Sequence, residues 1–169
     1  MAHRVCSLAS SDSPDADGCL IVSESGDYRC IRKVAVDGQV STLAGGPGGE
    51  HGNVDGQGAE TRFESPAFVA MDLDGSVLVA DTNCIRKVAP DGTASTFAGI
   101  TPEEDGYADG PAKIARFDGP QGVAVDQEGN AFVADTDNHS IRKISRDGAV
   151  STLAGSTEGE GGAPRGRRG

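Results

Sequence analysis

Aromatic residues are scarce in this 169-residue chain, which has no Trp, two Tyr and five Phe. A core must therefore be built mainly from Val, Ile, Leu and Ala. The chain also lacks any run approaching the roughly 20 apolar residues of a membrane-spanning helix. Its first residues, MAHRVCSLASSDSPDADG, contain no apolar segment of the signal-peptide kind. These absences argue against a helical membrane protein. They predict a soluble chain with no membrane partner, placed in the cytoplasm by default.

Basic residues are also scarce, because 15 Lys and Arg face 26 Asp and Glu, which gives a formal net charge of -11. The basic residues cluster only near the end of the chain, at Arg165, Arg167 and Arg168. An acidic surface repels phosphate backbones. We therefore expect no nucleic-acid partner.

Four cysteines are present, but no CxxC motif occurs. Cys30 and Cys84 hold the same position before an Ile-Arg-Lys sequence, where Ser140 stands in a third copy. The position therefore accepts a small side chain and does not require sulfur. Two disulfides remain open for a secreted protein. We favour free, partly buried thiols at these two positions and at Cys6 and Cys19.

The most informative feature of the sequence is its repetition. The text GPQGVAVDQEGNAFVADTDNHSIRKISRDGAVSTLAG, residues 119–155, has an earlier copy over residues 65–99 and a third copy that ends at Gly45. The Ile-Arg-Lys element begins at Ile31, Ile85 and Ile141, so its copies are almost evenly spaced along the chain. Self-similarity at a nearly fixed period indicates a repeat array.

Each copy divides into four short segments rich in Val, Ile, Thr and Phe, which are typical of strands. In the third copy these are residues 122–126, 131–135, 140–145 and 149–154. Short acidic-Gly turns join them, so sequential segments pair antiparallel. The first two segments are small or apolar at nearly every position, as in strands buried on both faces. We therefore predict an all-β fold, a β-propeller-type array of about three four-stranded antiparallel blades.

The text from Pro120 to Lys143 resembles the NHL repeat family, with the family's Asn-His pair at Asn138-His139. The resemblance covers residues 17–155 and departs in the first copy, where Ser23-Glu24-Ser25 replaces Ala-Asp-Thr. It implies a β-propeller, usually of six blades, that binds proteins, RNA or ligands on its faces. Three blades are incomplete relative to such a six-bladed ring.

The repeats also define the expected organisation of the chain. The segment that precedes them is a degenerate first strand or N-terminal segment, and the Gly- and Arg-rich tail is expected to be disordered. The connections have equal length, and each is expected to form an ordered loop with one helical turn. Each ends in Arg-Phe, whose Phe (Phe63 or Phe117) is expected to lie between blades. The expected segments are 1–16 (N-terminal segment), 17–155 (repeats, with blades at about 4–45, 65–99 and 119–155), 46–64 and 100–118 (connections) and 156–169 (tail).

An apparent calcium motif is explained by the repeats. The residues from Ser13 to Glu24, with Asp15, Asp17 and Gly18, nearly match the EF-hand spacing D-x-[DN]-x-[DN]-G-x5-E. Copies two and three carry related spacing, so the pattern is a hairpin turn followed by an acidic strand end. The histidines have no partners at ligand spacing. We therefore predict no metal site and no cofactor.

The recurring carboxylates Asp81 and Asp135 stand shortly before Arg86 and Arg142. One interpretation is a ring of carboxylates at a propeller mouth. We favour ion pairs within each blade, because a partly buried charge needs its partner. In the first copy Arg32 remains while Ser replaces the Asp, so that blade is expected to use the neighbouring Glu24.

Residues that occur only once are the better candidates for binding. One group is the acidic loop with a Tyr, Glu103, Glu104, Asp105 and Tyr107, which would suit a basic partner. The other is the pair Asn138 and His139. No nucleophile motif such as G-x-S-x-G occurs, so we assign no catalytic residue.

The favoured function is a non-enzymatic scaffold of the NHL type that mediates protein–protein interaction, within a fragment of a longer propeller protein. The alternative is a metal-dependent hydrolase or lyase of the propeller class, similar to a lactonase. Half a ring also leaves its end blades uncovered. Two chains joined as three plus three blades would complete a six-bladed homodimeric ring.

Overall fold

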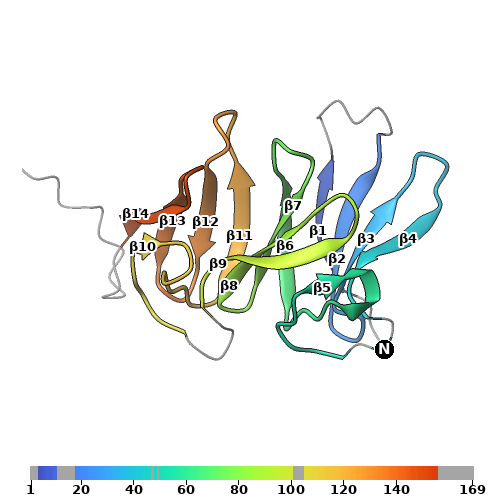
Figure 1. The fold of residues 1–169 in the computed structure, drawn as a ribbon, viewed down its shortest axis with the longest axis horizontal. Coiled ribbons are helices and arrows are strands. Elements are labelled where there is room, and N and C mark those ends of the chain that lie inside the picture. Colours follow the sequence, from blue (N-terminus) through green and yellow to red (C-terminus); the bar gives the residue numbers. More distant parts are fainter. Residues whose placement is uncertain (1–3, 11–17, 47, 49, 101–104, 156–169) are drawn as a thin grey trace, which may run out of the picture.

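The computed structural model describes residues 4–10 through their backbone, and residues 18–46, 48, 50–100 and 105–155 in full. These residues form three antiparallel sheets that stand side by side along the long axis of the molecule (Figure 1). The prediction of an all-β array is therefore confirmed. Within the described ranges, no helix is long and apolar enough to cross a membrane.

Each sheet contains one sequence repeat as a four-stranded meander, which we call blade 1, 2 or 3 in chain order. The strands of blade 1 are β1 (Arg4–Ser10), β2 (Leu20–Ser25), β3 (Cys30–Val34) and β4 (Val40–Ala44). Those of blade 2 are β6 (Pro66–Met71), β7 (Val77–Asp81), β8 (Cys84–Val88) and β9 (Thr93–Ala98). Those of blade 3 are β11 (Pro120–Val125), β12 (Ala131–Asp135), β13 (Ser140–Ile144) and β14 (Ala149–Gly155).

The two connections add a short fifth strand to the blade that follows each of them. β5 (Gly56–Gln57) pairs with β9, and β10 (Gly110–Pro111) pairs with β14. A 3-10 helix, η1 (Gly58–Glu60), follows β5, whereas a turn follows β10. A helical turn therefore occurs in the first connection. In the second connection it is replaced by a turn that keeps the backbone close to β14.

The core lies between the blades, because neighbouring sheets bury their facing sides against each other. Every residue of β7 is buried, as the nearly continuous apolar sequence of this strand predicts. Phe63 lies in the cluster shared by blades 1 and 2, and Phe117 in the cluster shared by blades 2 and 3. Both side chains are 0% exposed, so each connection supplies the aromatic side chain of one interblade core.

The turn between the last two strands of blade 2 also packs against blade 1. A Cβ at Gly92 would lie 2.5 Å from the carbonyl oxygen of Leu43 in blade 1. Gly92 also has a φ of +86°, a conformation that side chains disfavour. Blade contact therefore requires Gly at this turn.

Candidate functional site

The recurring arginine occupies the same place in each blade, on the third strand beside a β-bulge in the fourth strand. The register of each third strand against the fourth shifts between Ile31 and Arg32, Ile85 and Arg86, and Ile141 and Arg142. The extra residue of each bulge is Leu43, Phe97 or Leu153 on the fourth strand, opposite the arginine. Arg86 and Arg142 are 0% exposed, so their charges must be compensated inside the protein.

Arg142 is surrounded by hydrogen-bond acceptors. Its guanidinium lies 2.7 Å from Asp135, on its own blade, and 2.7 Å from Asp109 in the connection. It also donates to the carbonyl oxygens of Ala108, at 2.8 Å, and Arg116, at 3.0 Å. The arginine therefore fastens the connection to blade 3 while it holds the strand ends of that blade together.

Arg86 makes the same contacts in blade 2. It lies 2.8 Å from Asp55 and donates to the carbonyl oxygens of Val54 and Arg62 at 3.2 and 3.1 Å. Its distance to Asp81 is longer, 3.8 Å. Burial raises the pKa of Asp81 to about 6, even though its carboxylate also accepts two backbone N–H groups. The carboxylate of blade 2 is therefore less well compensated by its arginine than the carboxylate of blade 3.

Aromatic rings cover these guanidinium groups. The Arg86 guanidinium lies 5.3 Å from the ring centre of Phe63, and that of Arg142 lies 5.2 Å from Phe117. Arg142 also lies 4.6 Å from the ring centre of Tyr107. Such cation–π contacts strengthen when water is excluded. Tyr107, a candidate binding residue, thus has a structural partner in blade 3.

The arginine of blade 1 is contacted by residues of its own blade. Glu24 pairs with the first residue of β3 as Asp81 pairs with the first residue of β8, so Glu24 itself occupies the position of the recurring Asp. Arg32 lies 2.8 Å from this carboxylate. Its guanidinium lies 5.7 Å from the ring centre of Tyr28, in the loop between β2 and β3. Blade 1 therefore supplies both a carboxylate and an aromatic ring to its arginine from within its own sheet.

Asn138 belongs to the cluster of Arg142 and its hydrogen-bond partners, which we call the anchor of blade 3; the corresponding cluster around Arg86 is the anchor of blade 2. It is 8% exposed and donates to Asp135 at 2.9 Å and to the carbonyl oxygen of Gly106 at 2.8 Å. His139 is exposed and has a φ of +49°, a turn conformation that Asn and His adopt more readily than most residues. The pair that resembles the family motif is thus divided between a buried anchor and an exposed turn.

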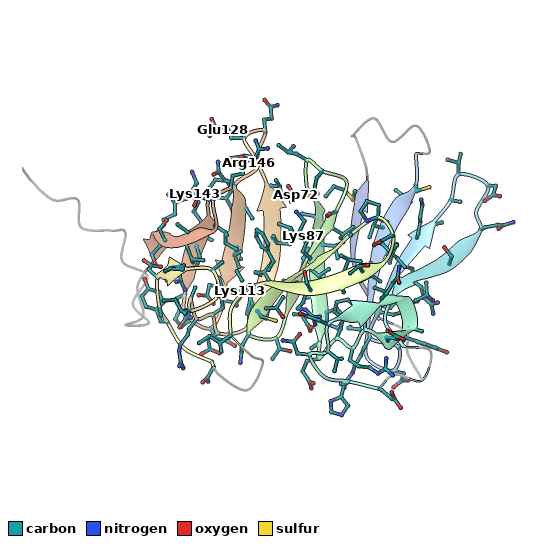
Figure 2. The ribbon with its side chains drawn as sticks, in the orientation of Figure 1. Asp72, Lys87, Lys113, Glu128, Lys143 and Arg146 are labelled. Carbon is teal, nitrogen blue, oxygen red and sulfur yellow. The ribbon has the colours of Figure 1, made fainter. Side chains whose placement is uncertain are left out.

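The hairpin turns that resemble calcium loops are occupied by internal cations and donors. In blade 2 the Lys87 ammonium lies 2.6 Å from Asp72 and 2.8 Å from Asp74, and Figure 2 shows Lys87 beside Asp72. In blade 3 Asp126 accepts hydrogen bonds from two backbone N–H groups of its own turn. Over the described part of the chain, no three His, Cys, Asp or Glu side chains converge as metal ligands would.

The cysteines lie inside the blades. Cys19, Cys30 and Cys84 are buried free thiols, whereas the side chain of Cys6 lies outside the described residues. Burial raises the pKa of Cys30 and of Cys84 to about 12. These two thiols therefore stay protonated and unreactive in the folded state, which makes them packing residues.

A cavity of about 660 Å³ opens where the three blades meet at one end of their strands. It is lined by Ser25, Ser65, Pro66, Ala67, Phe68, Thr82, Asn83, Asp118, Gly119, Pro120, Gln121 and Asp137. These residues come from the end of β2, the starts of β6 and β11, and the turns after β7 and β12. The cavity is thus formed by the array and not by any single repeat.

Two carboxylates give this cavity its charge. The backbone N–H of Asp137 donates to the carbonyl oxygen of Asp118 at 3.1 Å, which fixes the two residues side by side. Partial burial, followed by the charges of Asp105, Asp137 and Asp135, raises the pKa of Asp118. The cavity therefore has a negative potential that a positive group would relieve.

The structure thus relates one predicted binding residue to this cavity. Asp105 is exposed, and its charge acts on Asp118. Glu103 and Glu104 lie outside the described residues. The cavity residues Asp118, Asp137 and Thr82 are absent from the set predicted from the sequence. The sequence offers one indication of these residues, which is that each lies at or just after the end of a strand or a connection.

Comparison with known proteins agrees with this architecture. Residues 117–144 match the family model described as NHL repeat. The chain is 30% identical over 140 residues to NHL repeat-containing protein 2 of Homo sapiens, in a match that covers 77% of this chain and 19% of that protein. It is 36% identical over 96 residues to Protein SUPPRESSOR OF QUENCHING 1, chloroplastic, of Arabidopsis thaliana, in a match that covers 55% of this chain and 9% of that protein. The chain thus spans less than a fifth of either relative.

Among solved structures, the chain is similar to a gluconolactonase from Xanthomonas campestris, with a TM-score of 0.63 and 16% identity. The match covers 92% of this chain and 48% of that one. At this identity the likeness concerns the fold alone, which is that of a β-propeller. The 30% identity to NHL repeat-containing protein 2 over 77% of this chain, together with the matched repeat, shows that the protein belongs to the NHL repeat family.

Proposed function

We propose that the chain is a non-enzymatic interaction module of the NHL type that binds a protein partner at the cavity shared by its three blades. The observation that carries this proposal is the cavity itself, which all three blades line and which Asp118 and Asp137 make acidic. The recurring Asp and Arg residues are engaged in the anchors, which leaves the cavity carboxylates for recognition. The partner surface that fits this chemistry carries Lys or Arg side chains.

Electrostatics support a basic partner. The chain carries a formal net charge of -11, so its field favours the approach of positive surfaces at a distance. Close to the protein, partial burial and then the neighbouring carboxylates raise the pKa of Asp118. A bound ammonium or guanidinium would reverse this effect and lower that pKa. Binding should therefore weaken as ionic strength rises.

A direct test uses two fluorescein-labelled peptides of equal length, one with alternating Lys and Ser and one with alternating Glu and Ser. Fluorescence anisotropy should show saturable binding of the basic peptide only. Asp118→Asn and Asp137→Asn should each weaken this binding about tenfold, the loss expected for about 1.4 kcal/mol of charge-assisted contact. Glu60→Gln is the matched control, because Glu60 is exposed in η1 and does not line the cavity.

Equal binding of both peptides, or equal losses in all three variants, would contradict the proposal. The lactonase-like alternative rests on the same carboxylates, since propeller enzymes act at their central mouths. It predicts that Ca²⁺ or Zn²⁺ binds with a stoichiometry near one and that Asp118→Asn abolishes this binding. Isothermal titration with each metal distinguishes the two functions.

A further inference from the structure

Two residues that depart from the repeat lie at or beside the cavity. Ser23 in β2 stands where the other blades have Ala80 and Ala134, and Phe68 in β6 stands where blade 3 has Gly122. The side chains that the copies share build the blades, as the anchors show, whereas a side chain that one copy alone carries is available for a task of its own. Phe68 is such a residue, and Ser23 holds the backbone beside it.

Phe68 gives the cavity an aromatic surface. It is the one aromatic residue among the described residues that line the cavity, and it is 49% exposed. Phe63 and Phe117, which fill the interblade cores, are both 0% exposed. Phe68 is therefore not a core residue, and its exposed ring is available to a bound group.

The backbone that carries Phe68 is held from blade 1. The hydroxyl of Ser23, a residue that is 0% exposed, donates to the carbonyl oxygen of Ala67. The register of β6 against β7 shifts between Pro66 and Val69, so Ala67 and Phe68 form a bulge opposite one residue of β7. Bulges re-aim side chains and are frequent beside active sites. The ring is thus carried at the cavity by a backbone that contacts from two blades hold in place.

Carboxylates lie on the blade 3 side of the same cavity. Asp118 and Asp137 both line it, and a Cβ at Gly119 would clash with the Asp137 carboxylate, which therefore lies against the backbone just before β11. The Gly119 N–H donates to the Asn83 side chain at 3.1 Å, which ties this part of blade 3 to the turn of blade 2. Among the described residues that line the cavity there is no Lys, Arg or His. The cavity thus combines an aromatic ring with two carboxylates and supplies no cation of its own.

The blades show which group this combination holds. In the anchors of blades 2 and 3, buried guanidinium groups lie 5.3 and 5.2 Å from the ring centres of Phe63 and Phe117, and 2.8 and 2.7 Å from carboxylates. In blade 1 the guanidinium of Arg32 likewise has a ring and a carboxylate beside it. Lys87 and Lys143 also approach rings, but at 5.7 and 5.8 Å and at half-buried sites. The protein's own contacts therefore favour a guanidinium between a ring and carboxylates.

Given the binding function proposed above, on which this inference rests, we propose that the cavity receives an arginine side chain of the partner. Its guanidinium stacks on Phe68 and donates hydrogen bonds to Asp118 and Asp137. A guanidinium is planar, is weakly hydrated for a cation and carries several N–H donors, so it uses a ring face and two carboxylates at once. The ammonium of lysine is compact and strongly hydrated, which makes it the weaker ligand. A quaternary ammonium donates no hydrogen bond and is held by a cage of several rings.

Peptide binding tests the choice of cation. A peptide of alternating Arg and Ser is compared with the Lys–Ser and Glu–Ser peptides of the same length by fluorescence anisotropy. The Arg–Ser peptide should bind about tenfold more tightly than the Lys–Ser peptide. If neither basic peptide binds better than the Glu–Ser peptide, the proposed function fails together with the arginine assignment. If both basic peptides bind equally, or if a trimethyl-lysine peptide binds most tightly, the binding function stands and the arginine assignment is overturned.

Phe68→Leu separates stacking from charge. Leu keeps an apolar side chain but has no aromatic face, so the Arg–Ser peptide should bind about fivefold more weakly, as expected for the loss of one cation–π contact. The Lys–Ser peptide should lose less than about twofold. Because both carboxylates remain, the salt dependence of binding should not change in this variant, whereas Asp118→Asn should reduce it.

Phe132→Leu is the matched control. Phe132 is a half-buried residue of β12 whose ring centre lies 5.8 Å from the Lys143 ammonium, and it does not line the cavity. This variant should bind the Arg–Ser peptide as wild type does. Circular dichroism and urea unfolding check that each variant is folded. Unchanged Arg–Ser binding in folded Phe68→Leu, or the same loss in Phe132→Leu, would overturn the stacking of the guanidinium on Phe68.

Discussion

Neutralising the anchor carboxylate should destabilise blade 3 more than blade 2, although both residues are fully buried and hold the same repeat position. Asp135 lies 2.7 Å from Arg142, and its carboxylate also accepts hydrogen bonds from the Asp118 N–H, at 2.8 Å, and from the Asn138 amide, at 2.9 Å. Asp81 lies 3.8 Å from its arginine. The Asn substitution at each position keeps the shape and removes the charge.

The magnitudes follow from these contacts. Breaking a buried ion pair by removing one charge costs about 3–5 kcal/mol. Asp135→Asn should fall in this range. Asp81→Asn breaks a longer, weaker contact, but its amide leaves one of the N–H donors of Glu64 and Ser65 without an acceptor. One unsatisfied buried donor costs about 1–3 kcal/mol. The difference between the variants should therefore be about 2 kcal/mol.

Urea unfolding at pH 7, followed by far-ultraviolet circular dichroism, measures this difference. The free energy of unfolding is extrapolated to zero urea, with the slope m compared between variants to check that the unfolded states are alike. Equal losses for the two variants, or a larger loss for Asp81→Asn, would refute the inference that the ion-pair distance determines the strength of the anchor.

Three further predictions concern the same described residues. Asp81 has a folded pKa of about 6, above the unfolded value near 3.8, so the folded state binds more protons than the unfolded state as the pH falls through 6. Acidification from pH 7 to 5 should therefore stabilise wild type relative to Asp81→Asn by about 1.3 kcal/mol; urea midpoints at pH 5, 6 and 7 check this, and a constant difference would contradict it. Phe117→Ala should cost about 3–5 kcal/mol in urea unfolding, because Phe117 is 0% exposed between two blades, whereas Phe68→Ala, at a site that is 49% exposed, should cost less than about 1 kcal/mol. Burial raises the pKa of Cys84 to about 12, so Cys84 should resist iodoacetamide in the native protein and react with it in urea. Mass spectrometry of the Cys84 peptide measures the labelling, and labelling of the native protein at the rate of the unfolded protein would contradict the buried position.

The blade architecture could be predicted from the sequence because the repeat supplies its own comparison. Segments such as 77–81 are apolar on both sides, which suits only a strand between two sheets, and β7 is buried at every position. Because Phe63 and Phe117 recur at the same place in the two connections, they were expected to have the same environment. Both lie in interblade cores. Local pattern and tertiary packing agree at these positions.

The connections were harder to predict from the sequence. The very short strands β5 and β10 form because β9 and β14 offer an unpaired edge, a tertiary property that local propensity does not carry. For the same reason the second connection has a turn where a helical turn was expected. The partners of Tyr107 and Asn138 also depend on how a connection folds back onto its blade.

The cavity could not be predicted from the sequence of any single repeat. Asp118 and Asp137 are separated in the chain by the whole of β11 and β12, so no spacing rule joins them. They meet because the start of β11 and the turn after β12 lie at the same end of blade 3, where the Asp137 N–H donates to Asp118. The set chosen from the sequence instead lay mainly in the neighbouring connection.

Amide chemical-shift mapping of the Lys–Ser peptide on isotope-labelled protein tests the proposed binding site most directly. The largest shifts should fall on residues that line the cavity in different blades, including Thr82, Asn83, Gly119 and Asp137. Shifts concentrated instead at the opposite hairpin turns, such as Asp91-Gly92 and Asp147-Gly148, would contradict it.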